Sequence, residues 1–186
     1  MFLAIVGTRQ IQPMDTKLTQ KDVRFSTLLF GIIALILLIP LHLVFPPALY
    51  MNATRALALG SAIFWGLMSI LAARHFWKLY YRYFYPQWLR PLMPLNSLVY
   101  AGFGVGIWWL THSIKVPTIL CFTILGGIEG LAEHILAVSV LRVLEKVPFL
   151  EGLRPLPVLI FSFFEYVVYW ALVAWLTLGL IKISPL

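Results

Sequence analysis

The sequence predicts an all-α integral membrane protein, a bundle of five transmembrane helices with the N-terminus in the cytoplasm and the C-terminus on the opposite side. Two observations lead to this prediction. Of the 186 residues, 61% are hydrophobic and only 11% are charged, whereas a soluble domain carries roughly a quarter charged residues. In addition, apolar runs of about twenty residues recur along the chain, which is the length that a helix needs to cross a bilayer.

The predicted helices cover residues 26–45, 56–73, 97–114, 118–143 and 157–181. Prolines punctuate the connections, and proline is favoured in the first turn of a helix because its missing N–H has no partner there. Pro40 lies inside the first run, where we expect a kink. Residues 1–25 form the predicted cytoplasmic N-terminal segment. The length allows one membrane domain, residues 1–186, and no sizeable soluble domain.

The distribution of basic residues predicts the orientation. On the side of the N-terminus lie Arg9, Lys17, Lys21, Arg24, Arg74, Lys78, Arg82, Arg90, Arg142, Lys146 and Arg154. The other side has only Arg55, Lys115 and Lys182. Because cytoplasmic loops contain the excess of lysine and arginine, we expect a multi-pass protein of a plasma or inner membrane with its N-terminus inside. Asn52 begins a glycosylation sequon so near the bilayer that we interpret it as a chance match.

Residues 74–94 form a predicted cytoplasmic segment in which cations alternate with aromatic residues. Such a mixture can bind single-stranded nucleic acid. Here it directly continues a predicted membrane helix, so we interpret it as an aromatic belt with its cations on anionic headgroups. The expected headgroup-facing residues are Arg74, Lys78, Arg82 and Arg90. The expected partner is therefore the lipid bilayer, with anionic headgroups on the cytoplasmic side, and no nucleic acid.

Three acids, Glu129, Glu133 and Glu165, lie inside the fourth and fifth predicted helices. An acid at the centre of a bilayer costs about 2.5–3.5 kcal/mol on insertion scales, so each needs compensation. If the two helices form an antiparallel hairpin that turns near Leu150, Glu133 and Glu165 are at nearly the same depth. Glu129 is then one helical turn further out, level with Tyr169.

Helical geometry, at about 100° per residue, indicates which faces meet. On the fourth predicted helix, Gly126, Gly130 and Glu133 share one stripe. Glycines at this spacing allow a neighbouring helix to approach closely, which predicts tight packing against the fifth helix. A second glycine pair, Gly102 and Gly106 on the third predicted helix, is expected to pack against the same region.

The fifth predicted helix has a comparable stripe of Ser162, Glu165 and Tyr169. We therefore predict a buried polar cluster of Glu129, Glu133, Ser162, Glu165 and Tyr169, with His134 at its margin. The leading hypothesis is that this cluster handles a proton or a cation, because buried carboxylates at close range exchange protons when access changes. Glu133 and Glu165 would share the charge, and Glu129 and Tyr169 would tune it.

Three other interpretations stay open, and whether the protein is an enzyme is undecided. One is a metal-dependent enzyme acting on a lipid or quinone, since carboxylates and imidazole suit iron, manganese or zinc. Against it, Glu133 and His134 are adjacent, and the Glu-x-x-His spacing of helical di-iron bundles is absent.

A second interpretation is a non-catalytic accessory subunit of a larger membrane complex, whose acids would pair with an arginine of a membrane-protein partner and whose histidines could ligate a pigment or haem. A homo-oligomer is a further option for the partner. A third is purely structural, with protonated glutamic acids that hydrogen-bond one helix to another. Cys121 is the only cysteine, so an intrachain disulfide is impossible. No nucleotide-binding loop, nucleophile elbow or zinc-protease motif is present.

Overall fold

The computed structural model describes residues 17–44, 54–114 and 119–183, which are helical and contain no strand. The long helices are α1 (Gln20–Val44), α3 (Thr54–Leu71), α5 (Asn96–Ser113), α6 (Ile119–Ser139) and α8 (Pro155–Ile183). Shorter helical turns are η2 (Ala72–Phe76), α4 (Trp77–Leu79), η3 (Tyr81–Tyr83), η4 (Gln87–Leu95), α7 (Val143–Lys146) and η5 (Pro148–Leu150). The predicted sequon at Asn52 and residues 1–16 of the N-terminal segment lie outside the described residues.

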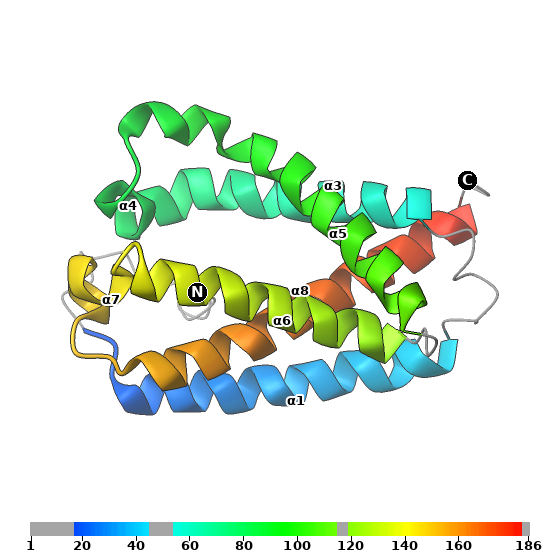
Figure 1. The fold of residues 1–186 in the computed structure, drawn as a ribbon, viewed down its shortest axis with the longest axis horizontal. Helices are drawn as coiled ribbons and strands as arrows, with labels where there is room; N and C mark the ends of the chain where they lie inside the picture. The colour runs from blue at the N-terminus through cyan, green and yellow to red at the C-terminus, as the bar shows by residue number, and fades with distance from the viewer. Residues whose placement is uncertain (1–16, 45–53, 115–118, 184–186) are drawn as a thin grey trace.

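Successive long helices run in opposite directions, as Figure 1 shows. The connection that contains α4 and η4 and the connection that contains α7 both lie at the end of the bundle where α1 begins. Helix α8 packs against α1, α3 and α6, while α5 packs against α3 and α6. Helix α8 is therefore the central helix, and its middle residues are buried from Glu165 to Ala171.

Four helical stretches are long and apolar enough to cross a membrane: Gln20–Val44, Thr54–Leu79, Ile119–Ser139 and Pro155–Lys182. The prediction of an α-helical protein is confirmed, and these four helices are compatible with the predicted membrane protein. Helix α5 is as long as α3, with 18 residues in each. It is less apolar because Asn96 stands at its start and Thr111 and His112 near its end.

Helix α1 begins at Gln20, earlier than the predicted residue 26, because a reciprocal cap starts it. The Thr19 N–H donates to Asp22 Oδ2 at 2.8 Å, and the Asp22 N–H donates to Thr19 Oγ1 at 3.3 Å. Such a pair satisfies two amide groups that lack helical partners. Residues 20–25, predicted as part of an extension, are therefore the first turns of the helix.

Helix α6 ends at Ser139, before the predicted residue 143. Arg142 follows in the left-handed conformation with φ of 53°, which is uncommon for a residue with a side chain. This reversal brings Val143 and Val147 to 3% and 0% exposure. The burial of two valines at the end of the bundle offsets the backbone strain at Arg142.

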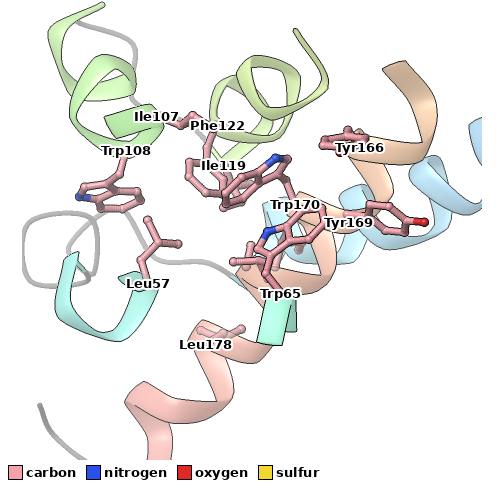
Figure 2. Packing of buried hydrophobic residues seen from close by; sticks show 13 residues of the cluster. Leu57, Trp65, Ile107, Trp108, Ile119, Phe122, Tyr166, Tyr169, Trp170 and Leu178 are labelled. Atoms are coloured by element: carbon pink, nitrogen blue, oxygen red, sulfur yellow. The ribbon is translucent and has the colours of Figure 1, made fainter. Parts of the chain in front are cut away.

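The main core of the bundle is aromatic. Figure 2 shows Trp65 from α3 beside Trp170 and Tyr169 from α8, and the Trp65 ring lies 6.0 Å from Trp170 and 5.5 Å from Tyr169 between centroids. Phe122 of α6 meets Trp170 edge to face at 5.6 Å. Aromatic pairs favour such edge-to-face geometry, so rings from three helices hold this core together.

The glycines of α6 allow this packing. A Cβ atom added to Gly126 would lie 2.1 Å from the Trp170 ring, and one added to Gly130 would lie 1.9 Å from the Tyr166 ring. The expectation for the second pair was wrong, because Gly102 and Gly106 have no atom within 4 Å of an added Cβ. The glycine of α5 that faces the core is Gly104, which lies against Ser61 and Trp170.

Candidate functional site

Glu133 of α6 accepts two tyrosine hydrogen bonds. The Tyr100 hydroxyl of α5 donates to Glu133 Oε2 at 2.7 Å, and the Tyr166 hydroxyl of α8 donates to the same oxygen at 2.6 Å. The two hydroxyl oxygens lie 3.3 Å apart. One carboxyl group thus connects three helices through hydrogen bonds from two phenol groups.

Glu165 lies on α8 with an exposure of 4%, and the Tyr169 hydroxyl, one turn further along the helix, donates to its Oε1 at 2.5 Å. The Tyr169 ring lies 5.7 Å from the Tyr166 ring. The partners of Glu133 and Glu165 therefore adjoin, and the two acids flank one group of rings. We call Tyr100, Glu129, Glu133, Glu165, Tyr166 and Tyr169 the tyrosine–glutamate cluster.

Glu129 is one turn from Glu133 on α6, and its partner is a tryptophan. The Trp170 indole N–H donates to Glu129 Oε2 at 3.2 Å, which agrees with the depth expected near residue 169. The other oxygen, Oε1, is buried and has no hydrogen-bond partner among the described residues. A buried acceptor without a hydrogen-bond partner is energetically unfavourable.

Two predicted members lie apart from these hydrogen bonds. The Ser162 hydroxyl donates to the Leu159 carbonyl of its own helix at 2.8 Å. His134 places Nδ1 3.0 Å from the Gly130 carbonyl, and its ring meets Tyr166 edge to face at 5.7 Å. His134 is thus at the margin of the cluster, while Ser162 satisfies its hydroxyl within α8.

Sequence reasoning missed the residues that join the acids. Tyr100 and Tyr166 were not among the predicted site residues, and neither was Trp65, whose ring stacks on Tyr100 at 4.0 Å with an interplanar angle of 15°. The available signal was the position of Tyr100 inside the third apolar run. Which of eight tyrosines meets an acid depends on how α5 is placed against α6 and α8.

The aromatic and basic segment also differs from a simple belt. Its four predicted headgroup-facing cations, Arg74, Lys78, Arg82 and Arg90, are exposed. However, Trp77 is only 5% exposed and packs with Ala72 and Met93 in a second core. Burial raises the pKa of Tyr81 above its ordinary value, and the neighbouring Tyr85, Glu133 and Glu165 add to the effect. Part of the segment therefore turns inward and packs against the end of α3.

Within the described ranges, no group of three or more His, Cys, Asp or Glu side chains is arranged to hold a metal ion. The chain matches no protein-family model, and searches among curated proteins and among solved structures find no similar chain. The function has to be argued from the geometry of the site.

Proposed function

We propose that the chain crosses a bilayer five times and moves or stores a proton at the tyrosine–glutamate cluster. The membrane placement is supported by the four apolar helices, by the alternating direction of α5 with its neighbours (Figure 1), and by the basic residues that precede α1 and follow α3 and α6. With these residues in the cytoplasm, the N-terminus is inside and the C-terminus outside.

Single-cysteine labelling tests the placement. Cys121→Ser removes the only cysteine, and one cysteine is then introduced at Arg142 or at Lys182. A membrane-impermeant maleimide should label the Arg142 variant only in inside-out vesicles and the Lys182 variant only in intact cells. Labelling of both from the same side would overturn the five-span count.

The observation that supports proton handling is the pair of tyrosine hydroxyls on Glu133, 2.6 and 2.7 Å from one oxygen and 3.3 Å from each other. A phenol can give its proton to a carboxylate while it accepts another, because its oxygen is both donor and acceptor. Glu129 extends the set, since its unpartnered Oε1 can take up a proton. Ionisable chains of this kind inside membranes are typical of proton relays.

A proton is favoured over a metal cation or sodium for a geometric reason. The tyrosine and tryptophan donors direct their hydrogens at Glu129, Glu133 and Glu165. The oxygens that accept these hydrogens are not open to a metal ion, and within the described residues no group of three or more His, Cys, Asp or Glu side chains could hold one. No observation favours the metal-dependent enzyme. The accessory-subunit alternative expects acids that point out of the bundle, whereas these acids have partners inside it.

Infrared spectroscopy of the carboxyl groups, combined with a measurement of proton flux into liposomes, tests the proposal. In the wild-type protein we expect a protonated-carboxyl band that titrates with pH, is lost in Glu133→Gln and shifts in Tyr166→Phe. In liposomes with a trapped pH indicator, the wild-type protein should dissipate a pH gradient faster than Glu133→Gln does.

The matched control is Glu145→Gln, which removes an exposed acid from the connection at the cytoplasmic end and should leave both signals unchanged. A carboxyl band that does not respond to pH, together with equal flux in Glu133→Gln and wild type, would leave the cluster with only a structural role and would refute proton handling.

A further inference from the structure

A groove of about 290 Å³ lies at the cytoplasmic end of α3, apart from the tyrosine–glutamate cluster. It is lined by Ile70, Ala73, Arg74, Arg90, Pro91 and Pro94. Its lining surface is almost wholly apolar, so Arg74 and Arg90 contribute mainly the carbon atoms of their side chains to it. Its lining residues come from the end of α3, from η2 and from η4, and Figure 1 shows the connection after α4 turning back over the end of α3.

The two arginines are held at the edge of the groove with their charge uncompensated. The Arg90 Nε donates to the Ala73 carbonyl at 2.9 Å, which fixes the guanidinium over the end of α3. Within the described residues, neither Arg74 nor Arg90 forms an ion pair. Arginine forks match the oxygen geometry of a phosphate group, so the two exposed arginines at the edge of the groove are suited to an anionic headgroup.

The backbone conformation beside the groove is also unusual. Ala73 and Arg74 belong to the π-helical turn η2, in which the Trp77 N–H donates to the Ala72 carbonyl. A π turn widens the helix and frequently marks a functional site. Here it is at the junction between the apolar stretch of α3 and the basic segment, where a phospholipid places its headgroup.

The apolar lining continues toward the hydrocarbon side. Ile70 is 44% exposed, and Leu67, one turn earlier on the same face of α3, is 60% exposed. An acyl chain can therefore run from the groove along these side chains. Free phosphate would use the arginines alone and would leave the apolar lining without a partner.

We infer that this groove binds one phospholipid with an anionic headgroup, its phosphate between Arg74 and Arg90 and an acyl chain over Ile70. The inference rests on the membrane placement proposed above and is independent of the proton step. It differs from general attraction to anionic membranes because two of the exposed cations of the segment, Lys78 and Arg82, do not line the groove.

Native mass spectrometry tests the inference on the full-length protein in detergent, with phosphatidylglycerol or phosphatidylcholine added. The wild-type protein should retain one phosphatidylglycerol in preference to phosphatidylcholine. The double variant Arg74→Gln with Arg90→Gln should bind phosphatidylglycerol about tenfold or more weakly, because it loses two charge-assisted contacts. The control, Lys78→Gln with Arg82→Gln, loses the same charge and should bind as the wild type does.

Equal weakening in both double variants would mean that only diffuse charge attracts the lipid, and the inference would fail. Displacement of the lipid by inorganic phosphate at equal concentration would also overturn it, because the acyl chain would then contribute nothing. Arg74→Gln alone keeps the Arg90–Ala73 bond, so it gives the same comparison with Lys78→Gln if the double variant does not fold. Glu133→Gln should bind lipid normally, which separates a failure here from a failure of the proton proposal.

Discussion

The two faces of α8 pack against their neighbours in different ways. Toward α1 the contact is almost wholly apolar, with Phe30 and Ala34 against Val167 and Val168, and Phe30 meets Phe161 edge to face at 5.3 Å. Toward α6, α5 and α3 the contact contains the tyrosine–glutamate cluster and the tryptophans beside it. One helix thus combines an apolar contact that packing alone explains with a polar contact that packing does not require.

This difference indicates why the acids are retained. Inside a membrane, association of helices depends on close packing, because lipid is as apolar as the side chains that it replaces. The contact with α1 shows that this chain can build such packing without acids. Each buried acid has an insertion cost in a membrane that the apolar face avoids, which fits the role proposed for the cluster. Four predictions follow, from the largest expected effect to the smallest; the first two compare the two faces, the third concerns the polar face alone, and the fourth concerns an exposed pair.

Gly130→Ala should destabilise the protein most. Its new Cβ would lie 1.9 Å from Tyr166 Cγ, so α6 and α8 would have to separate at a loss of about 1–3 kcal/mol or more. The control is Gly31→Ala on the α1 face, where the nearest atom of Phe164 is 3.8 Å away, an ordinary contact. Thermal unfolding in detergent measures both. Equal midpoints for the two variants would show that the polar face is no more tightly packed than the apolar one.

Trp170→Phe should have the next largest effect. It removes the indole donor of Glu129, whose other oxygen already lacks a partner, and an unsatisfied buried group costs about 1–3 kcal/mol. The control is Trp175→Phe, whose donor bonds to the Leu37 carbonyl of α1 at 3.2 Å. A helical carbonyl keeps other hydrogen bonds, so this loss should be smaller. Chemical denaturation measures the free energy of unfolding of both variants. A larger loss of this free energy in Trp175→Phe than in Trp170→Phe would contradict the prediction.

Tyr166, which donates a hydrogen bond to Glu133, should be energetically coupled to it. A double-mutant cycle of Tyr166→Phe with Glu133→Gln should give an interaction energy of about 0.6 to 1.7 kcal/mol, the range found for hydrogen bonds between membrane helices. Tyr169→Phe with Glu133→Gln should be additive, because the Tyr169 hydroxyl donates to Glu165. Coupling of the same size in both cycles would mean that the two acids act as one unit.

The smallest effect should come from an exposed pair outside the bundle core. The hydrogen bond and charge of Lys17 lower the pKa of Glu151 below its ordinary value of 4.5. A carboxylate with a lowered folded-state pKa stabilises the protein at neutral pH, and this contribution is lost as the pH falls through that lowered pKa. Glu151→Gln should therefore lower the unfolding midpoint slightly at neutral pH and not at acid pH. A difference that persisted at acid pH would contradict this account.

The candidate site was partly predictable from the sequence. Glu129, Glu133 and Glu165 attract notice because charge is rare in apolar runs, and helical spacing assigns their depth. Their hydrogen-bond partners were not predictable in the same way. Tyr169 follows Glu165 by four residues on one helix, whereas Tyr100 reaches Glu133 from α5. Local periodicity reports the first kind of contact and has no information about the second.

The ends of the helices were also only partly predictable from local sequence. The cap formed by Thr19 and Asp22 is a local signal, although the apolar run alone places the start of the helix later. The end of α6 has no local signal, since neither glycine nor proline occurs between Ser139 and Val147. The helix stops there because the reversal at Arg142 buries Val143 and Val147, a gain that exists only once the bundle has formed.

The sequence by itself determined the general character of this protein: long apolar helices, basic residues concentrated between alternate helices, and three acids inside apolar runs. These properties depend on composition and on spacing along one helix, and both can be read without knowledge of neighbours. Only the tertiary structure decided that Gly104 rather than Gly102 faces the core, that two tyrosines bond to Glu133, and that Arg74 and Arg90 flank one groove. Such contacts depend on the rotation and separation of whole helices, which many residues determine together.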